Sequence, residues 1–133
     1  MGHGDPGLTQ RLLALVNEER LKAGVPPLSS DWALAEAAQV EAQALSEAGN
    51  LSHLAPDGAS LVARVERAGY GSWSVLAENV AAGPASPEEV LAAWLASPTH
   101  WENLLNPEYA QAGVGYYYYS ESGHFWVLDL ASH

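Results

Sequence analysis

Two runs near the C-terminus decide the fold: AGVGYYYY at residues 112–119 and FWVLDL at residues 125–130. Both runs are rich in β-branched and aromatic residues, which favour strands. The sequence SESG at residues 120–123 separates them and is typical of a hairpin loop. We therefore expect an antiparallel hairpin at the end of the chain, with a third strand near Val75–Val80.

Helical periodicity dominates the part of the chain before this hairpin. It predicts three helices in the first half, one that ends at Gly24, one from Ser30 or Asp31 to about Ala48, and a short one from Ser60 to Gly69. The sequence SPEE at residues 86–89 is a capping box with proline at the first helical position, so another helix begins there and ends before Pro98. One or two further turns follow over His100–Leu105. Helices grouped around a small antiparallel sheet give the fold class α+β.

Composition excludes several classes of function. A chain of 133 residues that is 48% hydrophobic and 16% charged is typical of a globular domain with one core. Five Lys and Arg stand against 16 Asp and Glu, so the net charge is −11 and we expect no nucleic-acid partner, since phosphate binding needs clustered cations. No apolar run approaches the roughly 20 residues of a membrane span. The absence of cysteine excludes disulfides and leaves His, Asp and Glu as metal ligands.

The sequence contains none of the strong short catalytic motifs, such as a nucleophile elbow, a zinc-binding HExxH helix or a glycine-rich phosphate loop. Glu78 is flanked by apolar residues on both sides, in LAENV at residues 76–80. A buried carboxylate without a partner costs several kcal/mol or more, so Glu78 needs an imidazole, backbone amides or a metal. His53 and His100 are 47 positions apart, which is no local ligand motif. Glu78 and both histidines can equally be structural groups that tie loops together.

Segments spread over nearly the whole chain resemble one known family. They are NEER at 17–20, GVPPL at 24–28, SH at 52–53, AGY at 68–70, AENV at 77–80, WLASPTHWENLL at 94–105, NP at 106–107, GVGY at 113–116 and FWV at 125–127. This series resembles the CAP superfamily, the SCP-like domains related to cysteine-rich secretory proteins, antigen 5 and plant pathogenesis-related proteins, in its short bacterial form. The resemblance predicts a single domain over residues 8–131. Residues 1–7 are expected to be disordered or vector-derived.

The resemblance implies a three-layer α-β-α sandwich with a small antiparallel sheet between helices and a cleft that gathers two histidines and two acidic residues. Carried over by motif, the histidines are His53 and His100, and the first acid is Glu78. The place of the second acid is taken by Ser97. Two imidazoles with open water positions suit a divalent cation, with zinc as the candidate, and Glu78 would orient one imidazole or bind through water. Three polar residues would support the cleft: Ser97, Asn79 and Asn103.

The function that the resemblance implies is a secreted or extracytoplasmic domain, monomeric and without a membrane span. Its partner would be a small apolar ligand such as a lipid, a cell-wall component or a protein of the cell envelope. Two alternatives remain open. One is a metal-dependent hydrolase, a protease or esterase, that uses Glu78 as its base. The other is a purely structural extracellular domain whose polar cluster pins loops. The missing second acid and the lack of a nucleophile favour binding over hydrolysis.

Overall fold

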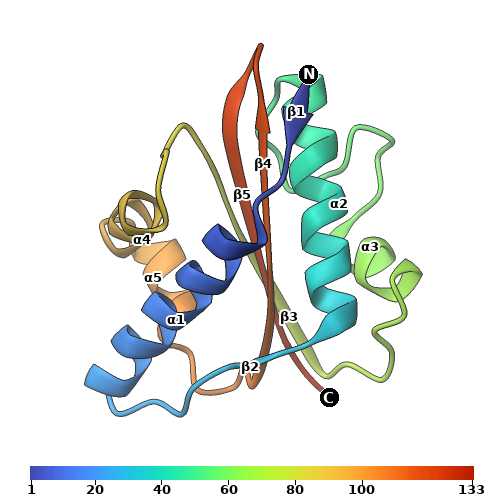
Figure 1. The fold of residues 1–133 in the computed structure, drawn as a ribbon. Helices are drawn as coiled ribbons and strands as arrows, with labels where there is room; N and C mark the ends of the chain where they lie inside the picture. The colour runs from blue at the N-terminus through green and yellow to red at the C-terminus, as the bar shows by residue number, and fades with distance from the viewer.

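An antiparallel sheet lies between two layers of helices in the computed structural model, which describes residues 1–133 (Figure 1). Its strands follow the order β1-β4-β5-β3. The strand bounds are Gly2–His3 for β1, Gln111–Tyr119 for β4, Gly123–Ser132 for β5 and Val75–Ala82 for β3. A short strand β2, Ser29–Ser30, pairs in parallel with the start of β4. The predicted α+β sandwich is confirmed, and so is the C-terminal hairpin.

Three helices cover one face of the sheet and two cover the other (Figure 1). The first layer holds α1 (Pro6–Lys22), α4 (Pro87–Leu95) and α5 (Pro98–Leu105), and the second holds α2 (Trp32–Ala48) and α3 (Leu61–Arg67). Four of these helices begin at a side chain that accepts a backbone N–H hydrogen bond, as N-caps do. The capping residues are Asp5, Asp31, Ser60 and Ser86.

The N-terminal residues 1–7, expected to be disordered or vector-derived, contribute to two elements of the structure. Gly2 and His3 form β1, which pairs with Tyr119 and Tyr118. Asp5 caps α1, and the helix begins at Pro6. None of the helices combines the length and the hydropathy that crossing a bilayer requires.

Helix α2 lies directly against the backbone of β4. A Cβ atom at Gly113 would overlap the backbone of Leu34 and Ala35, and one at Gly115 would overlap the carbonyl of Ala38. Only glycine permits this approach, because any larger side chain would push the helix away from the sheet. The approach fixes the height of α2 above the sheet, and therefore the position of Glu41 one turn further along.

Side chains of β3 alternate between the two helical layers. Val80 packs with Ala38 and Leu45 in the α2 layer, whereas Ala81 packs against the core of the α1 layer. The same alternation directs Glu78 toward α2 and α3 and Asn79 toward α5. Since β3 is the last strand of the sheet, polar groups on its two sides meet around one edge.

Candidate functional site

His53 and Glu78 lie in contact at this edge of the sheet. His53 lies in the loop between α2 and α3, and its Nδ1 is 3.1 Å from Oε1 of Glu78. The Glu78 side chain is buried, whereas that of His53 is 59% exposed. A buried carboxylate therefore holds one nitrogen of a ring whose other nitrogen is directed away from it.

Arg64 is the main partner of Glu78, and the sequence analysis missed it. Its guanidinium donates from Nη1 to Oε2 of Glu78 at 2.7 Å and from Nη2 to Oε1 at 3.2 Å. Nη2 also donates to the backbone carbonyl of His53 at 2.6 Å. Such a forked contact is specific to arginine and fixes both the carboxylate and the histidine loop. The available signal was an arginine within the apolar run LVARV at residues 61–65, where a buried charge requires a counter-charge.

Two further carboxyl groups are buried beside Arg64, and sequence reasoning missed these as well. Asp129 on β5 is the register partner of Glu78, and neither of its carboxyl oxygens meets a donor from another group. Oε2 of Glu41 on α2 is 3.7 Å from Nε of Arg64, an ion-pair contact that is too long for a hydrogen bond. One guanidinium thus faces three buried carboxyl groups, which cannot all be ionised at low cost.

Burial and the positive charge of Arg64 determine which of these three carboxyl groups are protonated. Burial raises the pKa of Asp129 well above its ordinary value, and the neighbouring Glu78 carboxylate raises it further. Burial also raises the pKa of Glu41, to about 6, against the opposing charge of Arg64. Burial opposes the ionisation of Glu78 too, but the neighbouring Asp129 carboxyl and the hydrogen bonds from Arg64 outweigh it and lower the pKa of Glu78. Glu78 is therefore the carboxyl group of the cluster that ionises most readily.

His100 lies on the other side of β3, in the first turns of α5. Its backbone carbonyl accepts a hydrogen bond from Nδ2 of Asn79 at 3.1 Å. Oδ1 of Asn79 in turn accepts from Nδ2 of Asn103 at 3.0 Å. The two asparagines thus fasten α5 to the edge strand. Burial lowers the pKa of the His100 imidazole, and the charge of His53 lowers it further.

Ser97, which stands where the resemblance places a second acid, is the N-cap residue of α5 but makes no side-chain capping hydrogen bond. Thr99, His100 and Trp101 follow it on the first turn of this helix. Ser97 is partly buried, and the groups that bind Glu78 are Arg64 and His53 rather than this hydroxyl.

Two imidazoles, those of His53 and His100, belong to the elements that flank this edge of the sheet, and imidazole nitrogens are common metal ligands. No group of three or more His, Asp or Glu side chains converges in a metal-binding arrangement. Glu78 is occupied by Arg64, so it supports His53 and leaves the imidazole nitrogens of His53 and His100 as the available ligands. Imidazoles suit zinc, copper and nickel better than calcium or magnesium.

Comparison with known sequences identifies related proteins. The profile of the cysteine-rich secretory protein family, CAP, matches residues 13–130. An uncharacterised protein of Bacillus subtilis, YkwD, is 35% identical over 121 residues, which are 91% of this chain and 46% of that protein. The uncharacterised membrane protein YlbC of Bacillus subtilis is 31% identical over 80% of this chain and 30% of its own length. The chain thus spans less than half the length of these curated relatives.

Solved structures share the fold over the entire chain. An extracellular protein of Bacillus anthracis that contains an SCP domain has a TM-score of 0.87 and 28% identity, over 96% of this chain and 41% of its own. An outer surface protein of Borrelia burgdorferi has a TM-score of 0.90 over 100% of this chain and 99% of its own. Its 24% identity supports a common fold only.

Proposed function

Because this chain belongs to the cysteine-rich secretory protein family, CAP, in its short bacterial form, we propose that it is an extracytoplasmic binding domain. In this proposal His53 and His100 bind a divalent cation, with zinc as the candidate, at the edge of β3. An apolar ligand or a component of the cell envelope docks beside them.

The contact between His53 and Glu78 is the observation that carries the cation proposal. A carboxylate on Nδ1 selects the tautomer with the proton on that nitrogen, so Nε2 keeps its lone pair. This is the arrangement by which carboxylates orient metal-binding histidines. Arg64 strengthens it by holding both Glu78 and the carbonyl of His53. The ring is therefore oriented before any cation arrives.

The environment of His100 supports the same proposal. Burial and the neighbouring His53 lower the pKa of its imidazole, which favours the neutral form. Only a neutral imidazole binds a metal, because the lone pair is otherwise protonated. Asn79 and Asn103 hold the helix that carries His100, so the backbone of His100 has a defined place relative to β3.

Exposed apolar side chains stand next to both imidazoles in the sequence and support an apolar ligand. Leu51 and Leu54 flank His53 with 45% and 54% of their surface exposed, and Trp101 follows His100 with 44% exposed. A hollow of about 350 Å³ adjoins the His53 loop and is lined partly by Ser52 and Leu54. A ligand with a polar head and an apolar body would use both kinds of group.

The location proposed for this domain rests on its relatives. The Bacillus anthracis structure that resembles it, at 28% identity, comes from an extracellular protein. The proposal of binding rather than hydrolysis rests on Glu78, because a carboxylate held by Arg64 and with a lowered pKa is poorly suited to accept a proton.

Calorimetric titration with zinc tests this function. We expect wild type to bind one zinc ion, and the variants His53→Ala and His100→Ala to lose about tenfold or more in affinity. His3→Ala serves as the control, since His3 is an exposed residue on β1 at the opposite edge of the sheet. Equal heats from wild type and both site variants would contradict the cation proposal.

A further inference from the structure

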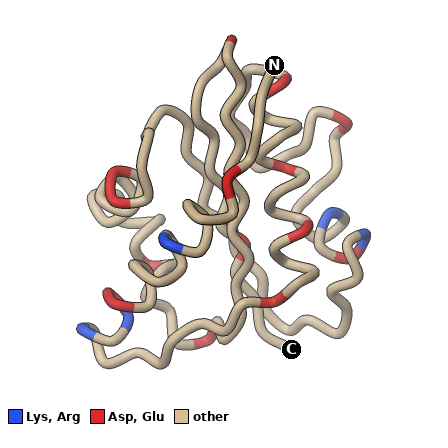
Figure 2. Tube along the Cα trace, in the orientation of Figure 1, with Lys and Arg blue, Asp and Glu red and all other residues tan.

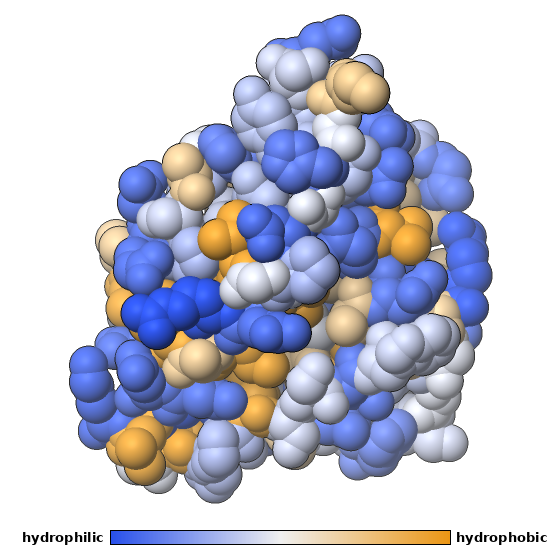
Figure 3. Space-filling view, viewed as in Figure 1, coloured by the Kyte–Doolittle hydropathy of each residue, from blue (hydrophilic) through white to orange (hydrophobic).

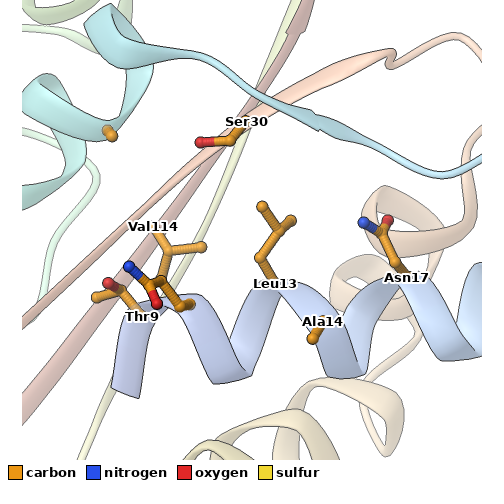
Figure 4. A pocket seen from close by; sticks show the side chains of 8 residues that line it. Thr9, Leu13, Ala14, Asn17, Ser30 and Val114 are labelled. Atoms are coloured by element: carbon orange, nitrogen blue, oxygen red, sulfur yellow. The ribbon is translucent and has the colours of Figure 1, made fainter. Parts of the chain in front are cut away.

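A trough follows the outer edge of β4, between α1 and α2, at the sheet edge opposite the histidines. Two adjoining hollows of about 340 and 520 Å³ form it, and both are lined by Thr9, Ala35 and Val114. In the smaller hollow, the side chains of Leu13 and Val114 point into the space that α1 and β2 enclose (Figure 4). The surrounding face is largely hydrophilic, with hydrophobic side chains visible between polar ones (Figure 3).

The floor of this trough is a part of the outer edge of β4 that no neighbouring strand covers. Strand β2 covers the outer edge of β4 only as far as Ala112, and β1 covers it only from Tyr118 onward. The backbone groups of alternate residues point to the same edge. The carbonyl of Ala112 faces outward, where it accepts the N–H of Asp31, so the N–H and C=O of Val114 face outward as well. No strand lies beside Val114 on that side.

The next residue whose backbone groups face outward, Tyr116, shows that an amide group can pair with this edge. Oε1 of Gln39 accepts the N–H of Tyr116 at 3.0 Å, and Nε2 of Gln39 donates to the carbonyl of Tyr116 at 2.7 Å. A side-chain amide thus occupies the place of a peptide group on a neighbouring strand. At Val114 the N–H and C=O groups face the trough in the same way. A backbone amide of another chain can form there the two hydrogen bonds that Gln39 forms with Tyr116.

The larger hollow adds a preference for positive charge. Asp5, Trp32 and Glu36 line it, and the Trp32 side chain is 74% exposed although it is one of the largest apolar groups in the chain. An exposed indole beside carboxylates suits a cationic side chain, which the ring face attracts. All five Lys and Arg residues lie on α1 and α3 (Figure 2). Of these, Arg11 is bound to Glu88 on α4.

We propose that this trough binds a short extended peptide segment of another protein that carries a basic side chain. The peptide adds to the free edge of β4 at Val114, with its backbone N–H and C=O paired there. A Lys or Arg side chain lies over Trp32 near Glu36, and an apolar side chain enters the hollow beside Leu13. The site does not include His53 or His100, so a failure of the cation proposal would leave this proposal unaffected.

Titration of the full, ¹⁵N-labelled chain with acetyl-Val-Lys-Val-Lys-Val-amide tests this proposal. We expect the amide signal of Val114 to shift in a saturable manner. The variants Trp32→Ala and Glu36→Gln each weaken binding by about fivefold, the size of an exposed cation–π or ion-pair contact. Leu21→Ala and Glu47→Gln are controls on exposed residues outside the trough and leave the Kd unchanged.

Two modified peptides probe the backbone and charge contacts without altering the protein. Replacement of both lysines by glutamates, or N-methylation of the central valine, should abolish saturable binding, because each removes one contact that the trough offers. Equal affinity for either modified peptide would overturn the proposal. A Val114 amide signal that stays unmoved at saturating lysine peptide would overturn it as well.

Discussion

Glu78 and Asp129 face one another across the ladder between β3 and β5, and both carboxyl groups are withdrawn from solvent. The two have opposite pKa shifts. Burial and the neighbouring Glu78 carboxylate raise the pKa of Asp129, whereas Asp129 and the hydrogen bonds from Arg64 lower the pKa of Glu78 despite its burial. These opposite shifts favour a pair in which Asp129 carries the proton and Glu78 is ionised. Ionised Glu78 is the acceptor that contacts Nδ1 of His53.

Replacing either member of this pair by its amide distinguishes their protonation states. Asp129→Asn retains a donor toward Glu78, so we expect it to lower the free energy of unfolding at pH 7 by about 1 kcal/mol or less. Glu78→Gln leaves Arg64 without its main counter-charge and should cost about 3 kcal/mol or more. Urea denaturation of both variants gives the comparison. A loss for Asp129→Asn as large as that for Glu78→Gln would mean that Asp129 is ionised.

The raised pKa of Glu41 predicts a pH-dependent stability. Its pKa is about 6 in the folded chain against an ordinary value of 4.5. The folded state binds this proton more tightly than the unfolded state, so Glu41 stabilises the fold below pH 4.5, and that contribution is lost as the pH rises to about 6. Glu41→Gln cannot titrate. The stability of the variant relative to wild type should therefore rise by about 2 kcal/mol between pH 4 and pH 7. A difference that stays constant over this range would contradict the raised pKa.

Two arginine substitutions compare a buried ion pair with an exposed one. Arg64→Met leaves Glu78 and Glu41 without compensation and should cost about 3–5 kcal/mol. Arg11→Met removes an ion pair with Glu88 in which both side chains are more than half exposed, so its cost should stay below about 1 kcal/mol. Denaturant midpoints at pH 7 measure both effects. Similar losses of unfolding free energy for the two variants would show that Arg64 does not stabilise the buried carboxyl groups.

Much of the fold was predictable because it depends on local signals. The caps at Asp31, Ser60 and Ser86 and the run of strand-forming residues after Gln111 each specify their own element. The contact of Gly113 and Gly115 with α2 was not predictable, since two glycines in a strand indicate a close approach without naming the partner.

That contact yields a packing prediction. Gly115→Ala should destabilise the fold by about 3 kcal/mol or more, because the added methyl group would overlap the Ala38 carbonyl and displace α2. Gly71→Ala is the matched control, since a Cβ atom at Gly71 meets nothing within 4 Å and its φ is not positive. Thermal unfolding compares the two. Equal stability of both variants would show that α2 does not depend on this approach.

The candidate site was predictable only in part. Apolar neighbours on both sides of Glu78 indicated that the carboxylate is buried and needs a partner, and an imidazole was among the partners considered. Arg64 and Asp129 became visible only in three dimensions, because α3 and β5 approach Glu78 through tertiary packing that no local pattern encodes. The family resemblance supplied His100 as a second ligand, which remains a prediction.

Imidazole nitrogen shifts during a zinc titration test the central claim, that His53 and His100 together bind a cation beside Glu78. In ¹⁵N-labelled chain at pH 7.5, the account predicts that Nε2 of His53 and a ring nitrogen of His100 shift with one common Kd, while His3, His124 and His133 stay unmoved. It also predicts weaker binding below about pH 6.5, where imidazoles become protonated. Shifts confined to the other three histidines, or separate Kd values for His53 and His100, would contradict the claim.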